Sequence, residues 1–242
     1  MLQEAVIHTE HVSRQFGRIS VLDRISLQVA RGEIFGLLGP SGAGKTTLVK
    51  LIAGIDEASS GEVRVLGSRM PKLDTLRRIG YMAQSEALYA DLTAKENLQF
   101  FASLYGLSGA ARRRRIAETI ELVNLSEYMN RQVHRFSGGM KRRLSLAAAL
   151  LHEPEVLILD EPTVGIDPAL RQSIWRKLAE LSELGTTVIV TTHVMDEAYK
   201  CRRLGMIRDG RLIATGSPQQ LMSDTGTTTI EDAFLHYGGG GQ

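Results

Sequence analysis

The chain has 242 residues, of which 43% are hydrophobic and 23% are charged, and its formal net charge is +2. This balance is typical of an ordinary globular protein and does not favour nucleic acid as a partner, because nucleic-acid-binding chains usually carry a strongly basic face. The single cysteine, Cys201, excludes a disulfide framework and favours a reducing compartment. The most apolar stretch, Leu144–Leu151, is far shorter than the roughly 20 residues that cross a bilayer, so we expect any action at a membrane to go through a partner protein.

The first part of the chain alternates short β patterns with turns. Ile34–Leu38 is a continuous apolar run, which is typical of a strand buried on both faces. The segment Lys45–Ala53 has a helical pattern and is followed by Gly54, a common helix terminator. Three further patterns predict an antiparallel layer of strands, at Ala5–Thr9, Val21–Val29 and Glu62–Leu66.

The later part of the chain returns to strand patterns. Val156–Leu159 and Val188–Val190 predict two buried strands, separated by the amphipathic helix Pro168–Leu184, which begins with proline and is followed by glycine. Strands that alternate with helices in this way predict βαβ units and a parallel sheet. Asp209 and Gly210, between two short β runs, predict a hairpin.

The segment between these two parts, residues 93–151, has a helical pattern and no clear strand. We therefore predict one domain whose α/β core comprises residues 1–92 and 152–215, with a helical subdomain inserted between them. We expect residues 216–237 to form a helical tail, and the Gly-rich residues 238–242 to be flexible.

The strongest local motif follows the first buried strand and fits G-x-x-x-x-G-K-[ST], in the strand–loop–helix context of a phosphate-binding P-loop. Its glycines let consecutive N–H groups point at one centre, and the start of the helix adds a positive dipole end. Lys45 offers a charge to the β- and γ-phosphates, and Thr46 offers a hydroxyl to Mg²⁺. The motif predicts a nucleotide site with ATP and Mg²⁺ as ligands, formed by Gly39, Pro40, Ser41, Gly42, Ala43, Gly44, Lys45, Thr46 and Thr47.

Two adjacent carboxylates, Asp160 and Glu161, follow the second buried strand. Open α/β sheets bind ligands at this end of their strands, and neighbouring residues of a strand face opposite sides, so we expect two different roles. Asp160 suits the magnesium shell, directly or through water, and Glu161 suits a base that polarises the attacking water. Such a pair can also be plain solvated surface, but the P-loop upstream favours the functional interpretation.

The next motifs distinguish among P-loop nucleotide hydrolases. Phe136–Met140, before a helix, resembles the signature motif LSGGQ of ABC transporter ATPases, with Phe and Met where Leu and Gln are commonest. Gln84, Asp167, His193 and Phe16 fall where that family has its Q-loop, its D-loop, its switch histidine and the aromatic that stacks on adenine. The chain is therefore identified as a member of this family.

The resemblance implies an α/β fold with a P-loop NTPase (RecA-like) core, an N-terminal antiparallel β layer and an inserted α-helical subdomain. It implies that Phe16 stacks on the base, and that His193 contacts the γ-phosphate and holds the water together with Glu161. It implies that Gln84 contacts Mg²⁺ and the attacking water and reports the nucleotide state to a permease. The implied catalytic residues are Glu161, His193 and Gln84, and the implied metal ligands are Thr46, Gln84 and Asp160.

The signature motif is implied to act on a second subunit. In this family a head-to-tail dimer clamps each ATP between the P-loop of one subunit and the signature of the other, here Phe136, Ser137, Gly138, Gly139 and Met140. The departures at Phe136 and Met140 leave the backbone donors of Ser137–Gly139 in place, so we expect activity to survive. The resemblance also implies a separate transmembrane permease and a peripheral position at the cytoplasmic face of the membrane, with no nucleic acid bound.

Weaker signals bear on the direction of transport and on other functions. The form SGGM before Lys141–Arg143, and the ending Ile230–Leu235, are similar to ATPases that export drugs, lipids and polysaccharides. A soluble ABC-type ATPase acting on ribosomes or DNA is the alternative, but such proteins typically carry two of these domains or a long coiled-coil insertion. A kinase or GTPase would leave the signature and His193 unexplained, and the chain has no N-K-x-D motif.

Two basic runs have more ordinary interpretations. Arg112–Arg115 predicts a solvated helix face, with attraction to anionic lipid head groups as the alternative. Lys141–Arg143 either supports the neighbouring phosphate site or is surface charge.

Overall fold

The computed structural model describes residues 4–85 and 87–239. Residues 240–242 of the tail, which we expected to be flexible, lie outside the described residues. The first of two sheets is antiparallel and has the strand order β2-β1-β4-β5. Its strands are β1 (Ala5–Phe16), β2 (Ile19–Ala30), β4 (Ser60–Val65) and β5 (Ser68–Arg69). The expected antiparallel layer is thus confirmed.

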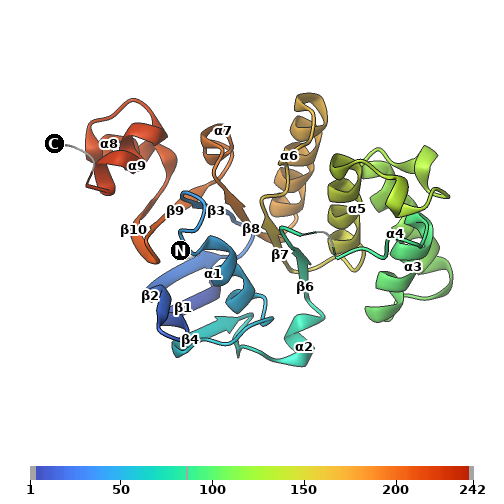
Figure 1. Ribbon diagram of the computed structural model, residues 1–242, viewed down its shortest axis with the longest axis horizontal. Helices are drawn as coiled ribbons and strands as arrows, with labels where there is room; N and C mark the ends of the chain where they lie inside the picture. The colour runs from blue at the N-terminus through green and yellow to red at the C-terminus, as the bar shows by residue number, and fades with distance from the viewer. Residues whose placement is uncertain (1–3, 86, 240–242) are drawn as a thin grey trace.

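The second sheet forms the centre of the molecule and has the order β10-β9-β3-β8-β7-β6 (Figure 1). Its neighbouring strands are parallel except for the β9–β10 hairpin, which turns at Asp209 and Gly210, both with positive φ. The short strand β6 carries no pattern long enough to be predicted. The strands are β3 (Ile34–Leu38), β6 (Ile79–Met82), β7 (Val156–Asp160), β8 (Thr187–Thr192), β9 (Arg203–Arg208) and β10 (Arg211–Gly216).

The register of this sheet brings three strand ends to one edge. Leu38 of β3 pairs with Thr192 of β8, and Asp160 of β7 pairs with Thr191. The polar segments that follow β3, β7 and β8 therefore leave the sheet side by side, at the edge where open α/β sheets bind ligands.

Two hydrophobic cores cover the two faces of the central sheet. On one face, α1 (Lys45–Ile52) and the first sheet pack on side chains such as Phe35 and Leu37. On the other face, α6 (Pro168–Glu183) and helix α5 (Gly138–Leu150) pack on Leu157, Leu159 and Val188. Two four-residue helices complete the core, α2 (Leu73–Leu76) and α7 (Met195–Ala198).

The middle of the chain is helical, as predicted, and lies at one end of the molecule (Figure 1). It consists of α3 (Ala94–Leu104), α4 (Gly109–Leu122), α5 and two 3₁₀ turns, Ser126–Tyr128 and Val133–Arg135. Helix α3 begins at a capping box, in which the Thr93 hydroxyl accepts from the Glu96 N–H and the Glu96 carboxylate accepts from the Thr93 N–H.

Side chains join α3 and α4 to the end of α5 and to His152, which follows it. The rings of Tyr105 and His152 are stacked, with centroids 3.5 Å apart. Arg115 donates to the carbonyl oxygens of Leu150 and Leu151, at the end of α5. Arg115 therefore departs from the expected solvated face, because its guanidinium satisfies carbonyl groups that the end of a helix leaves free.

The C-terminal helices α8 (Pro218–Thr225) and α9 (Ile230–Tyr237) lie at the opposite end of the molecule from α3 and α4 (Figure 1). Both begin at hydroxyl caps, Ser217 and Thr229. Among the described residues, no helix has the length and apolar character that crossing a membrane requires.

Candidate functional site

The P-loop links the end of β3 to the first turn of α1. Gly44 precedes the helix at φ 104°, where a Cβ would also lie 2.7 Å from Leu22, so only glycine fits. Lys45, the first helical residue, folds back over the loop, and its Nζ donates to the carbonyl oxygens of Gly39 (2.7 Å) and Pro40 (2.9 Å). Its ammonium is thereby held at the centre of the loop.

A cavity of about 220 Å³ opens over this loop. Its walls come from the P-loop, from β2, from the segment after β6 and from the end of β7. Burial lowers the pKa of the Lys45 ammonium, while the carboxylates of Glu161 and Asp160 act to raise it. The lining residues are Val21, Ser41, Gly42, Gly44, Lys45, Thr46, Thr47, Gln84 and Glu161.

Asp160 is fully buried at the end of β7. Its Oδ1 accepts a hydrogen bond from the Thr191 hydroxyl on the neighbouring strand β8. Its Oδ2 is buried and has no hydrogen-bond partner among the described residues. A buried carboxylate oxygen without a donor is costly, so this atom marks a position where a further ligand is to be expected.

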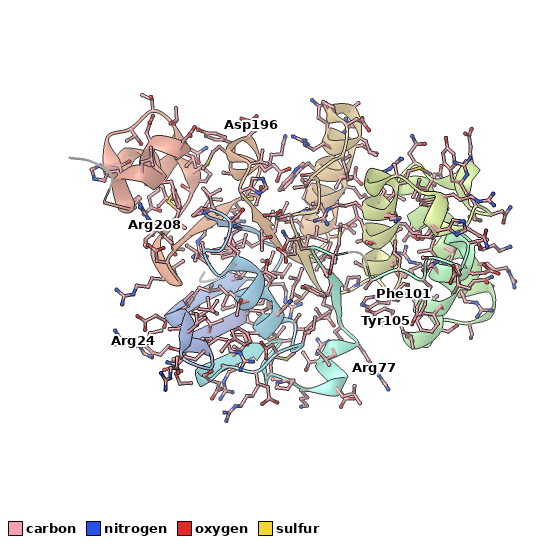
Figure 2. All side chains as sticks on the ribbon, viewed as in Figure 1. Arg24, Arg77, Phe101, Tyr105, Asp196 and Arg208 are labelled. Atoms are coloured by element: carbon pink, nitrogen blue, oxygen red, sulfur yellow. The ribbon has the colours of Figure 1, made fainter. Side chains whose placement is uncertain are left out.

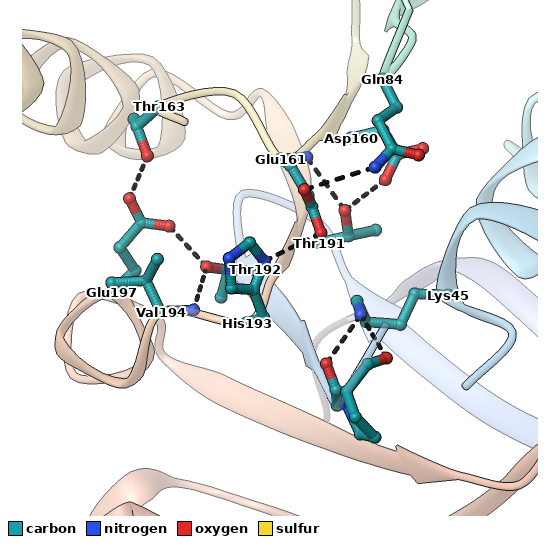
Figure 3. A network of polar contacts seen from close by, with 12 residues as sticks. Lys45, Gln84, Asp160, Glu161, Thr163, Thr191, Thr192, His193, Val194 and Glu197 are labelled. Carbon is teal, nitrogen blue, oxygen red and sulfur yellow. Dashed lines mark hydrogen bonds and ion pairs between the residues drawn. The ribbon is translucent and has the colours of Figure 1, made fainter. Parts of the chain in front are cut away.

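Glu161 turns away from Asp160 because its backbone leaves the strand with a positive φ of 53°. Its N–H is held by Thr191, whose carbonyl and hydroxyl oxygens both accept from it. Its carboxylate lies 3.0 Å from Nδ1 of His193 and 3.5 Å from Nε2 of Gln84 (Figure 3). The structure thus brings together the three residues that the sequence assigned to catalysis.

Arg142 is a contributor that the sequence analysis missed. It lies in the first turns of α5, is only 6% exposed, and donates to the carbonyl oxygens of Gln84, Asp160 and Glu161. The basic run Lys141–Arg143 was the available signal. Three consecutive residues of a helix point in different directions, so the run alone does not show which of the three side chains faces the core. The interpretation of Arg142 as surface charge is therefore wrong, because its buried guanidinium contacts backbone carbonyl oxygens beside the site, while support for the neighbouring phosphate site stays a prediction.

The signature segment lies apart from this cavity. Ser137 caps α5, and its hydroxyl accepts from the N–H of Met140 at 3.3 Å. A Cβ at Gly139 would lie 2.8 Å from the carbonyl oxygen of Gly165, so the turn before Asp167 packs directly on the signature. None of the five signature residues, all of them described, lines the cavity over the P-loop.

Asp167 and Phe16 also lie outside the cavity lining. Asp167 caps α6, and its Oδ1 accepts from the N–H of Leu170. Phe16 ends β1 with 48% of its surface exposed, and the Arg14 guanidinium lies 4.5 Å from its ring centroid. Arg14 is itself held by Asp56 at 2.7 Å.

Comparisons of the sequence place these motifs in a family. A model of the ABC transporter family matches residues 22–164. The probable multidrug ABC transporter ATP-binding protein YbhF of Escherichia coli is 41% identical over 239 residues. That alignment covers 96% of this chain and 41% of YbhF, so the chain spans less than half the length of that relative.

Two other relatives are matched over most of their length. The linearmycin resistance ATP-binding protein LnrL of Bacillus subtilis is 42% identical, and the alignment covers 93% of this chain and 73% of LnrL. The Nod factor export ATP-binding protein I of Paraburkholderia xenovorans is 42% identical, with 95% of this chain and 77% of the relative covered.

Solved structures give the same result for the fold. The ATP-binding subunit of an ABC transporter superposes with a TM-score of 0.89 at 27% identity, covering 96% of this chain and 99% of that one. A dimeric ATP-binding cassette in a post-hydrolysis state, bound to ADP and Pi, superposes with a TM-score of 0.81 at 29% identity, covering 87% and 98%. The chain therefore belongs to the ABC transporter family, and it is similar over nearly all of its length to ATP-binding proteins named for multidrug transport, linearmycin resistance and Nod factor export.

Proposed function

We propose that this chain hydrolyses ATP as the motor subunit of an exporter and that it drives a separate transmembrane permease from the cytoplasmic face of the membrane. The observation that carries the proposal is the cavity in which the P-loop meets Gln84 and Glu161, with His193 hydrogen-bonded to Glu161. The products are ADP and phosphate. The matched relatives named for multidrug transport, linearmycin resistance and Nod factor export support the outward direction.

In the proposed reaction the P-loop amides and Lys45 bind the β- and γ-phosphates, and Phe16 stacks on the adenine. Glu161 accepts a proton from the attacking water, and Gln84 and His193 orient that water and the γ-phosphate. The 3.0 Å contact between His193 and Glu161 supports this assignment, because a base needs a neighbour that fixes its direction. The positive φ of Glu161 fits a residue held in a strained, functional conformation.

The residues at the end of β7 fit a magnesium ion. Asp160 presents a buried Oδ2 with no partner among the described residues, and Thr46 and Gln84 offer uncharged oxygens on the cavity wall. Oxygen donors of this kind, few in number and completed by phosphate oxygens, are what Mg²⁺ prefers. When bound, the ion would neutralise charge on the transferring phosphoryl group.

The separation of the signature from the cavity supports a head-to-tail dimer. Residues Ser137–Gly139 form a helix start that can bind an anion, yet they do not reach the phosphate site of their own chain. A second copy would bring its signature to this P-loop and offer its own P-loop in return. The related cassette solved as a dimer with ADP and Pi supports this arrangement.

A groove beside Gln84 supports the proposal of a permease partner. A cavity of about 270 Å³ at the junction of core and helical subdomain is lined mainly by apolar side chains, among them Met82, Leu88 and Phe101, and it includes Ser85, which follows Gln84. Phe101 and Tyr105 lie together at this junction (Figure 2). An apolar segment of the permease that docks there would contact the same loop that lines the nucleotide cavity. The alternative of a ribosome- or DNA-directed ATPase receives no support from the matched relatives.

The test is Glu161→Gln, compared with wild type in ATPase assays and in gel filtration with ATP and Mg²⁺. We expect hydrolysis to fall by about a hundredfold or more, because the base is lost, while the variant elutes as a dimer when ATP is present. Glu183→Gln, an exposed site on α6, is the matched control and should behave like wild type. Hydrolysis at the wild-type rate by Glu161→Gln would contradict the assignment of the base. A variant that stays monomeric with ATP would contradict dimerisation by the isolated chain.

A further inference from the structure

Glu197 is a buried carboxylate that the proposed reaction does not use. It lies in the short helix α7, four residues after His193, and only 2% of its surface is exposed. Its Oε1 accepts from the Thr163 hydroxyl and, at 3.5 Å, from the indole Nε1 of Trp175. Its Oε2 accepts from the Thr192 hydroxyl at 2.7 Å (Figure 3).

The two threonines stand next to the residues proposed for catalysis. Thr192 is the last residue of β8 and directly precedes His193, and its hydroxyl also accepts from the N–H of Val194 at 2.9 Å. The hydroxyl of Thr192 therefore closes the turn that carries His193. Thr163 lies two residues after Glu161, in the segment that leads to Asp167. One carboxylate thus connects the loop after Glu161 with the loop of His193.

The chemistry of the contact explains why a carboxylate is needed. Within the described part of the chain, all three donors to Glu197 are uncharged, so the group is buried without a cation to offset its desolvation. An apolar side chain would fill the same space at lower cost, but it could not accept hydrogen bonds from two loops. Only a carboxylate offers two equivalent acceptor oxygens, one to each threonine.

We propose that Glu197 is a positioning residue, which holds the His193 turn and the segment from Glu161 to Asp167 in one fixed arrangement. This inference rests on the proposed roles of Glu161 and His193. Because the two segments meet at one carboxylate, movement of the segment that ends at Asp167 would change the direction of His193, and with it the contact between His193 and Glu161. The P-loop takes no part in this network, so ATP binding should be independent of it.

The test compares two threonines on the same strand. Thr192→Val removes the hydroxyl that bonds Glu197, whereas Thr187→Val removes a hydroxyl at the other end of β8, where Thr187 is 1% exposed and accepts from the N–H of Gly32 at 3.0 Å. We expect Thr192→Val and Glu197→Gln to lower kcat about tenfold to a hundredfold, because small displacements of catalytic groups have effects of this size. We expect Thr192→Ser to restore it, and Thr187→Val to keep the kcat of wild type.

Three further measurements separate positioning from stability alone. The dissociation constant for a non-hydrolysable ATP analogue with Mg²⁺ should stay within about twofold of wild type in every variant, since the P-loop is unchanged. The Tm for thermal unfolding should fall by a similar amount in Thr187→Val and Thr192→Val, because each variant loses one buried hydroxyl. The fluorescence of Trp175, the single tryptophan, should change in Glu197→Gln but not in Thr187→Val.

A purely structural role predicts that kcat follows stability, so equal kcat in Thr192→Val, Glu197→Gln and Thr187→Val would overturn the inference. His193→Ala belongs in the same series. If it loses hydrolysis while Thr192→Val and Glu197→Gln keep it, only the role of Glu197 is wrong. If His193→Ala hydrolyses ATP like wild type, the proposed role of His193 fails, and the role of Glu197 fails with it.

Discussion

Helices α1 and α5 both begin at glycine-rich turns, yet their first turns are completed in different ways. The turn before α1 has Gly44 as its cap, no side chain of the described residues caps its N–H groups, and Lys45 is held over the loop. The turn before α5 is capped by the hydroxyl of Ser137, and it packs against the backbone of Gly165. The turn before α1 lines a cavity together with Glu161, whereas the turn before α5 does not line that cavity.

In the proposed head-to-tail dimer, this difference would let the two helix starts take different parts in one reaction. A helix N-terminus that binds phosphate within its own chain needs N–H groups that no side chain caps, a positively charged side chain and a cavity. The N-terminus of α1 has all three. A start that acts on a partner's nucleotide must hold its shape while it is exposed, and the Ser137 cap and the contact with Gly165 supply that rigidity. Substitutions confined to one helix start should therefore have different effects from substitutions in the other.

The largest effect is expected for Lys45→Met, which removes the charge from the α1 start and keeps the length of the side chain. We expect ATP affinity to fall by about a hundredfold or more, because a buried ammonium paired with phosphate is lost. Calorimetric titration with ATP would measure the loss. Lys50→Met, an exposed lysine on the same helix, is the control. Equal affinity in both variants would mean that the α1 start does not bind phosphate through Lys45.

Two neighbouring glycines at the start of α5, Gly138 and Gly139, have different surroundings and can be compared by substitution. A Cβ at Gly139 would lie 2.8 Å from the Gly165 carbonyl oxygen, whereas a Cβ at Gly138 would meet nothing within 4 Å. We expect Gly139→Ala to lower stability by about 2 kcal/mol, or roughly 6 °C in Tm, and Gly138→Ala to leave it unchanged or raise it slightly. Thermal unfolding of the nucleotide-free chain measures this. The monomer of each variant should bind ATP like the wild-type monomer, and a weaker affinity of either monomer would contradict the separation of the two helix starts within one chain.

The smallest effect concerns His152, which follows α5 and stacks on Tyr105. Burial lowers the pKa of its imidazole to about 4, from an ordinary value of 6.5, while its Nε2 lies 3.1 Å from the Ile79 carbonyl oxygen. The unfolded chain therefore binds a proton as the pH falls below 6.5, and the folded chain does not until near pH 4. Stability contributed by the neutral ring is complete above pH 6.5 and is lost progressively as the pH falls between these values.

His152→Phe keeps an aromatic ring in this place and removes the titrating group. Between pH 7.5 and pH 5.5, we expect wild type to lose about 1 kcal/mol more of its free energy of unfolding than the variant loses. Urea unfolding at the two pH values would measure the difference. An identical pH dependence of both proteins would show that His152 titrates alike in the folded and unfolded chain. ATP affinity at pH 7.5 should not differ, since the residue lies away from the α1 start.

Local patterns in the sequence predicted the buried strands and the helices that bracket the site. Ile34–Leu38 forms β3 as predicted, and α1 begins at Lys45 because the glycine before it can adopt a positive φ. The alternation of buried strands and helices predicted the parallel sheet, and the sheet places Asp160 and the turn after β3 at one edge. The strand β6 was not predicted, since a four-residue run gives too little periodicity.

The sequence by itself determined the family, the phosphate-binding loop and the identity of the candidate catalytic residues, because each belongs to a short motif and these motifs follow one another in the order of the family. The tertiary structure decided which groups support them. Arg142 reaches the carbonyl oxygens of Gln84 and Glu161 from a different helix, and Glu197 connects Thr163 with Thr192 across 34 and 5 residues of chain. Such contacts leave no local pattern, since they depend on how strands and helices pack, and the hydrogen bonds they make are directed at backbone and hydroxyl groups that every sequence contains.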